Sequence, residues 1–263
     1  MLRSAVVVVG LGLARGALAG GPTLVALTED GALVVFAADR PAVTRTVRPA
    51  GVTGRLLGID RRPADGRVYG LTTGNDLYRI DVAGGTAALV ATLTVPFDGD
   101  VRSGIDFNPQ ADRLRLVSSD GRNLRVNVDL GATAVDAALA YARDDANAGR
   151  RPHVTAAAYS NNLAGAATTK LFEIDADLDV LVVQDPPNDG ILATVGPLGV
   201  DFGPLGGFDI VTDATGADRA WAASGATLYA INLSSGRATT IGTIGEGRMQ
   251  VVSLTAAPEV PAP

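Results

Sequence analysis

The stretches GIDRRPADGRVYGL (residues 58–71) and GIDFNPQADRLRLV (residues 104–117) repeat one pattern. In each copy a short apolar run ends in Asp, and a turn that contains Pro precedes a second apolar run. Short apolar runs separated by Gly, Pro and Asp are typical of β-strands joined by tight turns. The duplication therefore predicts a β-structure built from repeated units.

A second element follows each copy and also occurs elsewhere in the chain. It reads GALVVFAADRP, NDLYRIDVAGG, RNLRVNVDLGA, TKLFEIDADLD and ATLYAINLSSG, with its leucine at Leu33, Leu77, Leu124, Leu171 and Leu228. The intervals between these leucines are 44, 47, 47 and 57 residues. Periods in the forties with strands in every unit indicate a β-propeller rather than a helical solenoid.

Each unit can be divided into four strands, which in the second unit are LLGID, RVYGLT, LYRIDV and TAALVATL. The first unit, residues 23–49, lacks a match to LLGID, whereas MQVVSLTA from Met249 is a surplus strand at the other end. Pairing the two would complete a blade and leave no open sheet edge. We therefore expect an all-β fold, a propeller of about five four-stranded blades closed by the N- and C-terminal strands.

Two segments resist this division. HVTAAAYSNNLAGAATTK, in the fourth unit, has no clear two-strand interpretation, and residues 136–149 fit either a short helix or a long loop. Leu171 is assigned to the third strand of its unit, and the 57-residue interval after it is ascribed to the additional stretch QDPPNDG.

The composition excludes several classes of function. The net charge is −6, which repels phosphate backbones, so we expect no nucleic-acid partner. The chain has no cysteine, which excludes disulfides, thiolate metal sites and thiol catalysis. A protein, a glycan or a small ligand remains as partner, and we expect a monomer.

The N-terminus, MLRSAVVVVGLGLARGALAG, has the layout of a secretory signal peptide, with a basic start, a short apolar run and small residues before the cleavage site. We expect residues 1–20 to be this signal peptide, residues 21–257 to be one propeller domain, and residues 258–263 to be a Pro-rich tail. The alternative is that AVVVV is a first strand of the domain. The favoured interpretation predicts a secreted or extracytoplasmic protein without a transmembrane segment in the mature chain.

The amino-acid sequence of the repeats resembles that of a bacterial family, the domain of unknown function (DUF) 4394. The resemblance extends over about residues 23–256 and is carried by GIDFNPQADRLRLVSSDGRNLRVN, AAAYSNN and TKLFEIDADLDVLVVQDPPNDGILATVGPLGVDF. It implies a propeller-like domain, frequent in exported proteins, without an assigned activity or site residues.

Asp60, Asp106 and Asp209 occupy matching places in GID, GID and GFD. Because Pro follows two of them three residues later, the favoured interpretation is that each caps a tight turn. The alternative is that first strands line a central channel and bring the carboxylates together as Ca²⁺ ligands. We therefore expect no cofactor, with Ca²⁺ as the alternative. Four further residues, at the ends of third strands, are expected to form Asx turns: Asp81, Asp129, Asp175 and Asn232.

The stretch QDPPNDG, residues 184–190, occurs in one unit alone. Its polar side chains, Asp185, Asn188 and Asp189, are the best candidates for ligand binding, because long loops on rigid scaffolds tend to carry binding sites. The alternative is a rigid turn without a ligand.

These observations favour a non-enzymatic ligand- or protein-binding module. The competing interpretation is an extracytoplasmic metal-dependent hydrolase or lactonase-like enzyme that uses the channel carboxylates. Propellers host both classes, so the fold does not decide whether the protein is an enzyme.

Overall fold

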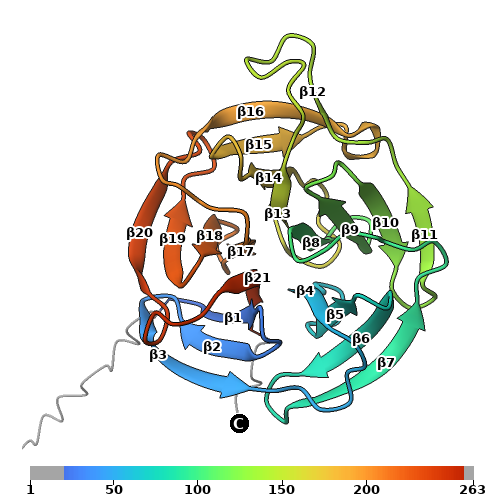
Figure 1. Ribbon diagram of the computed structural model, residues 1–263, viewed down its shortest axis with the longest axis vertical. Coiled ribbons are helices and arrows are strands. Elements are labelled where there is room, and N and C mark those ends of the chain that lie inside the picture. Colours follow the sequence, from blue (N-terminus) through green and yellow to red (C-terminus); the bar gives the residue numbers. More distant parts are fainter. Residues whose placement is uncertain (1–20, 258–263) are drawn as a thin grey trace, which may run out of the picture.

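The computed structural model describes residues 21–257, which form five antiparallel sheets around one central axis (Figure 1). Blade 1 joins both ends of this region and runs outward as β21 (Val251–Ala256), β1 (Thr23–Thr28), β2 (Leu33–Ala37) and β3 (Arg40–Val47). Blade 2 consists of β4 (Leu56–Arg61), β5 (Val68–Thr72), β6 (Asp76–Asp81) and β7 (Thr86–Thr92). Blade 3 consists of β8 (Ser103–Asn108), β9 (Arg113–Ser118), β10 (Asn123–Asn127) and β11 (Ala132–Val135).

Blade 4 runs outward as β13 (Val154–Tyr159), β14 (Leu171–Asp175), β15 (Val180–Gln184) and β16 (Ile191–Pro197). A fifth, two-residue strand, β12 (Ala140–Tyr141), pairs in parallel with the outer edge of β16. Blade 5 consists of β17 (Gly206–Thr212), β18 (Asp218–Ser224), β19 (Thr227–Ile231) and β20 (Ala238–Thr243). The all-β propeller of five four-stranded blades expected from the repeats is thus confirmed.

The ring closes through the two ends of the chain, as expected. β21 lies antiparallel to β1, with Leu24 opposite Ala256 and Ala26 opposite Leu254 (Figure 1). β21 is the innermost strand of blade 1, so the C-terminal segment supplies the strand that the first repeat lacks. Blade 1 therefore has four strands like the others, and the edge of β1 that faces the axis is covered by β21.

The core lies between neighbouring blades. The innermost strands are buried over nearly their whole length because the next blade covers each of their faces, as in the burial of all six residues of β13 and β21. Between blades 2 and 3, Tyr69 and Phe107 pack edge to face, with ring centroids 5.6 Å apart. The outermost strands are less buried, and all residues of β7 are exposed or half-buried.

Blade 4 departs from the expected register. Leu171 begins the second strand, β14, and not the third, because β13 and β14 are separated by an irregular connection over residues 160–170. The third strand is β15, so QDPPNDG is the turn between β15 and β16 and does not lengthen the interval as expected. The extra residues precede the blade instead, in residues 136–153, which form turns and β12; the loop interpretation of residues 136–149 is confirmed.

The predicted signal peptide and the Pro-rich tail lie outside the described residues. Within residues 21–257, the helical structure is a single 3-10 turn, η1 (Pro187–Asp189). No helix in this part of the chain reaches the length and apolarity that crossing a membrane takes.

Candidate functional site

Three aspartates from three blades meet at the centre of the ring. Asp60 lies on β4, Asp106 on β8 and Asp209 on β17, each at the same place of an innermost strand. Each offers a carboxylate oxygen, and the three oxygens lie within 4.8 Å of one another. Each residue is only 1% exposed. We call these three residues the channel carboxylates.

Hydrogen bonds between blades hold these side chains in place. Asp60 accepts a bond from the backbone N–H of Phe107, at 2.8 Å. Asp106 accepts one from Tyr159, at 3.0 Å. In each case the donor lies on the innermost strand of the next blade, one residue after the position that matches the aspartate. Each carboxylate therefore links its own blade to the following one.

The same link occurs at the closure of the ring. Asp209 accepts a bond from the N–H of Ala256, at 2.5 Å, and Thr255 of the same strand accepts one from Arg61, at 3.0 Å. The Thr255 hydroxyl in turn donates to Asp60, at 2.8 Å. Blade 4 has Ala158 at the matching position, which carries no acceptor. The expected turn role of the three aspartates is thus wrong, because their carboxylates bond across blades and not within their own turns.

A glycine two residues before each aspartate lets the strands approach. A Cβ atom on Gly207 would lie 2.2 Å from the backbone N of Leu254, and one on Gly104 would lie 2.7 Å from the backbone N of Ala157. A Cβ on Gly58 would lie 2.7 Å from a side-chain atom of Ile105. The motif Gly-x-Asp therefore combines a close approach of strands with a carboxylate aimed at the axis.

Burial and mutual repulsion disfavour ionisation of all three carboxyls together. Burial raises the pKa of Asp60 to about 7, against bonds from Thr255 and Phe107 that lower it. Burial also raises the pKa of Asp106 well above its ordinary value, and the charges of Asp60 and Asp209 raise it further. The pKa of Asp209 rises for the same reasons, with Asp60 as the neighbouring charge. A buried group of this kind must hold protons or a cation.

Two of the carboxylates still have an unused oxygen. Oδ2 of Asp106 and Oδ1 of Asp209 are buried and have no hydrogen-bond partner among the described residues. Buried polar atoms without a partner are rare, and a shared proton or a bound cation would account for these two oxygens. The donor set is all oxygen, and 4.8 Å is about twice a Ca²⁺–oxygen distance of about 2.4 Å. The three residues fit a hard divalent cation that completes its shell with water.

The loop 184–190 docks onto blade 3. The side-chain oxygen of Asn188 accepts a bond from Nη2 of Arg115, at 2.9 Å, and the carbonyl of Pro187 accepts one from Asn123, at 2.9 Å. Asp185 and Asp189 are exposed. Asn188 thus has a packing role at this interface, and ligand binding by the loop stays a prediction.

A buried polar cluster lies between blades 3 and 4, and the sequence did not predict it. Arg115 and Asp136 form an ion pair of 2.7 Å whose side chains are 4% and 5% exposed. Glu173 lies nearby, fully buried, and neither of its carboxylate oxygens has a partner within residues 21–257. Burial raises the pKa of Glu173 to about 8, and the charge of Arg115 lowers it less than burial raises it. The raised pKa favours the protonated form of Glu173 near neutral pH.

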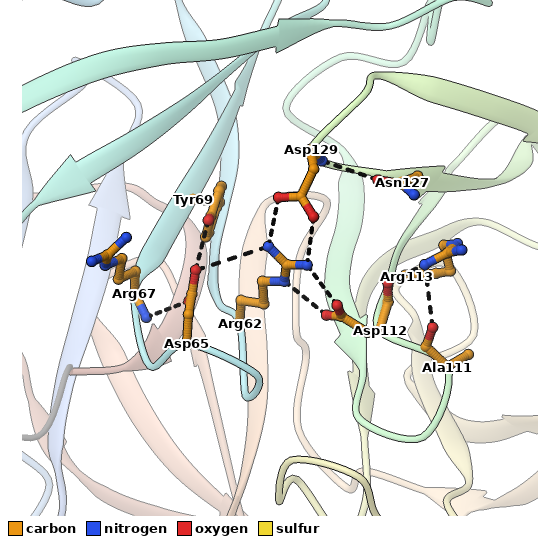
Figure 2. Close-up of polar contacts among 9 residues, drawn as sticks. All are labelled: Arg62, Asp65, Arg67, Tyr69, Ala111, Asp112, Arg113, Asn127 and Asp129. Atoms are coloured by element: carbon orange, nitrogen blue, oxygen red, sulfur yellow. Dashed lines mark hydrogen bonds and ion pairs between the residues drawn. The ribbon is translucent and has the colours of Figure 1, made fainter.

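A second cluster joins blades 2 and 3 at the surface (Figure 2). The Arg62 guanidinium bonds Asp112 through Nε and Nη2, at 2.7 and 2.5 Å, and Asp129 through Nη1 and Nη2, at 2.8 and 3.0 Å. We call Arg62, Asp112 and Asp129 the Arg62 cluster. Asp129 therefore serves an ion pair between blades, and the expectation of an Asx turn there is wrong. At Asp81 the Asx turn is confirmed, since Oδ1 accepts bonds from Ala83 and Gly84.

The alignment of the two repeats contains one signal for the Arg62 cluster, an aspartate in place of a glycine. Asp112 has a φ of 50° and stands where the preceding repeat has Gly66, whose φ is 68°. A glycine is the usual residue in that left-handed conformation, and aspartate is one of the few others that tolerate it. The exchange of glycine for a charged residue places a carboxylate beside Arg62.

The fold and the channel carboxylates define a five-bladed β-propeller with an acidic centre. The model of the family described as Domain of unknown function (DUF4394) matches residues 32–255. The chain belongs to this family.

Among the solved structures compared, one has a TM-score above 0.5, and its likeness concerns the fold alone. A structural genomics protein of unknown function from Bacteroides thetaiotaomicron VPI-5482 matches with 16% identity and a TM-score of 0.52, over 91% of this chain and 65% of that one. Virginiamycin B lyase from Staphylococcus aureus matches with 15% identity and a TM-score of 0.44, over 84% and 69%. An auxiliary nutrient binding protein from B. thetaiotaomicron matches with 14% identity and a TM-score of 0.44, over 74% and 55%. The chain thus spans less than two thirds of the first of these structures. No curated protein sequence matches it.

Proposed function

We propose that the domain is a non-catalytic binding module, exported from the cell, whose channel carboxylates hold a divalent cation of the Ca²⁺ class. The observation that carries this proposal is the convergence of three buried carboxylates, two of which keep an oxygen without a partner. A cation at their centre would satisfy these oxygens and replace the repulsion among three negative charges by attraction.

The cation would also join blades. The channel carboxylates belong to blades 2, 3 and 5. Blades 2 and 3 are successive in the sequence, whereas blade 4 separates blade 5 from them, so a shared ligand ties together parts of the ring that the backbone connects only indirectly. Extracellular modules typically bind Ca²⁺ with dissociation constants of about 10⁻⁴–10⁻³ M, which suits an exported protein.

The burial of the site favours this role over the enzymatic alternative. A hydrolase or lactonase that used these carboxylates would have to bring substrate into contact with them. Each of the three residues is 1% exposed, and each already bonds the next blade. A single ion can enter such a site, whereas a substrate would have to separate the innermost strands.

Thermal unfolding of the purified protein, stripped with a chelator and titrated with Ca²⁺ or Mg²⁺, tests the proposal. We expect Ca²⁺ to raise the melting temperature, since a ligand at about 100 times its dissociation constant adds about 2.7 kcal/mol to the free energy of unfolding. Mg²⁺ should stabilise less, because it demands six ligands at about 2.0–2.1 Å. Calorimetric titration should give one ion per chain.

Asp106→Asn is the informative variant. Asparagine keeps an oxygen that can accept the bond from Tyr159 but removes one charge, so the metal-free variant should melt at or above the temperature of the metal-free wild type. Its response to Ca²⁺ should be lost. Asp144→Asn, at an exposed position, is the matched control and should respond as the wild type does. Equal melting curves of the wild type with and without either cation would show that the channel carboxylates hold protons instead.

A further inference from the structure

A pocket of about 810 Å³ opens between blades 1 and 2, and four arginines line it. They come from β3, from β4, from the residue before β5 and from β6, and are Arg45, Arg61, Arg67 and Arg79. We call this the arginine pocket. Its positive charge stands out in a chain with a net charge of −6.

None of these four arginines has a carboxylate within 4.0 Å in the described part of the chain, whereas arginines such as Arg62, Arg115 and Arg122 do. The Arg45 guanidinium donates only to the carbonyl of Val82, at 3.4 Å from both Nη atoms. Nε of Arg61 is buried and has no partner at all among residues 21–257. A buried cationic donor without an acceptor is costly, and an anion bound in the pocket would supply that acceptor.

The one acidic residue of the lining does not compensate these charges. Oδ1 of Asp81 accepts bonds from the N–H groups of Ala83 and Gly84, each at 3.0 Å, and thereby closes the turn after β6. The lining thus holds four arginines and a single carboxylate. Arg61 is half-buried and the other three arginines are exposed, so solvent screens their charges until an anion binds.

At the next interface along the ring, between blades 2 and 3, aspartate side chains of the protein compensate the charge of an arginine. Between blades 2 and 3, Arg62 lies between Asp112 and Asp129 (Figure 2). Between blades 1 and 2 the arginine pocket has no equivalent of these two aspartates. An anion that pairs with these arginines would come from outside residues 21–257.

The rest of the lining is apolar and describes the ligand further. Val35, Ile80, Val82 and Val211 form part of the wall. A volume of about 810 Å³ falls within the range of about 300–1,000 Å³ that small-molecule sites occupy. Guanidinium groups match the paired oxygens of carboxylates and phosphates.

We propose that the arginine pocket binds a small organic oxyanion, a carboxylate or phosphate attached to an apolar body. The arginines hold the oxyanion and the valine and isoleucine side chains cover the apolar part. The pocket does not include the channel carboxylates but adjoins them, because its lining contains Arg61, which follows Asp60, and Ala256, whose N–H donates to Asp209.

Calorimetric titration of the purified protein with 1-naphthyl phosphate, at physiological ionic strength and in the presence of a chelator, tests the proposal. Decanoate provides the carboxylate arm, inorganic phosphate supplies the head alone, and 1-naphthol supplies the apolar body alone. We expect one molecule of 1-naphthyl phosphate or of decanoate per chain, and binding at least about tenfold tighter than that of either phosphate or 1-naphthol.

Arg45→Gln combined with Arg79→Gln removes two of the four positive charges of the pocket. The Val82 carbonyl is the one acceptor that loses an arginine donor in this variant. We expect this variant to weaken both amphiphilic probes by about tenfold or more. Arg143→Gln combined with Arg150→Gln, at two exposed positions, makes the same change of charge elsewhere and should bind as the wild type does. The proposal is overturned if neither amphiphilic probe binds better than its separate parts, or if both variants weaken binding equally.

Discussion

Oδ2 of Asp60 lies 2.8 Å from the backbone nitrogen of Phe107 and thereby fastens blade 2 to blade 3 at the axis of the ring. The other carboxylate oxygen of Asp60 accepts a bond from the hydroxyl of Thr255, in blade 1, at 2.8 Å. One side chain thus touches three blades. The channel carboxylates therefore have two separable properties, a bond between blades and a negative charge.

Substitution at Asp60 separates these two properties. Asp60→Ala leaves the N–H of Phe107 and the hydroxyl of Thr255 without their acceptor, so we expect a loss of about 2 kcal/mol in the free energy of unfolding. Asp60→Asn removes the charge and keeps one acceptor oxygen, for the N–H of Phe107, while its amide N–H can donate to the Thr255 hydroxyl, so the metal-free protein should lose less stability than with alanine. Urea unfolding in the presence of a chelator measures both variants. Equal losses in the two would show that charge, and not the bond, stabilises the ring.

The glycines of the Gly-x-Asp motif should respond to alanine in a fixed order. A Cβ on Gly207 would meet backbone atoms of Ser253 and Leu254 at 2.4 and 2.2 Å, and one on Gly104 would meet backbone at 2.7 Å. Gly58 faces the flexible side chain of Ile105 instead. Overpacking typically costs about 1–3 kcal/mol.

We therefore expect Gly207→Ala to be the most destabilising, Gly104→Ala to follow, and Gly58→Ala to cost about 1 kcal/mol. Gly31→Ala is a control of another kind, because its Cβ would meet nothing within 4 Å but its φ is 81°. Melting temperatures of the four variants test this ranking. If Gly58→Ala were the most harmful of the motif variants, close approach of the strands would not be the reason for the glycines.

The Arg62 cluster should contribute more to the free energy of unfolding than an ordinary surface ion pair does. The Arg62 side chain is 10% exposed and bonds two carboxylates at once, although Asp112 and Asp129 are 38% and 58% exposed and therefore partly screened. Arg62→Gln should lower the free energy of unfolding by about 1–2 kcal/mol, and less at high salt.

Arg48→Gln is the matched comparison. Its pair with Asp30 is more than 60% exposed on both sides, so its loss should change the free energy of unfolding by less than about 0.5 kcal/mol. Urea unfolding at low and high salt measures both substitutions. The cluster would be no more than a surface pair if Arg62→Gln and Arg48→Gln had the same effect.

The sequence repeats were sufficient to predict the ring and its closure, because strand periodicity and the surplus terminal strand depend on local pattern alone. They misplaced Leu171, since β14 reads LFEID and so resembles a third strand such as LYRID. The role of Asp106 was misjudged because an Asp near Pro suggests turn chemistry. The turn is in fact capped by Asn108, whose side-chain oxygen accepts bonds from Gln110 and Ala111 at 2.9 Å.

The arginine pocket and the burial of Glu173 could not be predicted from the sequence repeats, because both depend on how neighbouring blades pack. Arg45 and Arg79 come from different blades with no common spacing in the sequence, and only the packing of blade 1 on blade 2 places them together. Likewise, the pattern of β14 marks Glu173 as a polar residue between Phe172 and Ile174, which would normally face solvent. A second sheet covers that face, and the strand pattern alone does not reveal it.

Glu173 should make the stability of the protein depend on pH. Its pKa is about 8 in the folded protein because of burial, and about 4.3 in an unfolded chain. Between these two values the folded state holds a proton that the unfolded state has released. The free energy of unfolding should therefore fall as the pH rises through this range, by up to about 1.4 kcal/mol per pH unit for this one proton.

Glu173→Gln removes this dependence, because a neutral amide replaces the protonated carboxyl and does not titrate. The variant should match the wild type near pH 5 and exceed its melting temperature at pH 8, where the wild type must either hold the proton or bury a charge that only Arg115 faces. The channel carboxylates contribute a slope of the same sign, so the informative quantity is the difference between the variant and the wild type. Glu246→Gln, at an exposed carboxylate, should leave the pH profile unchanged. Parallel profiles of wild type and Glu173→Gln from pH 5 to pH 8 would mean that Glu173 is already ionised in the folded protein, with its charge balanced by Arg115.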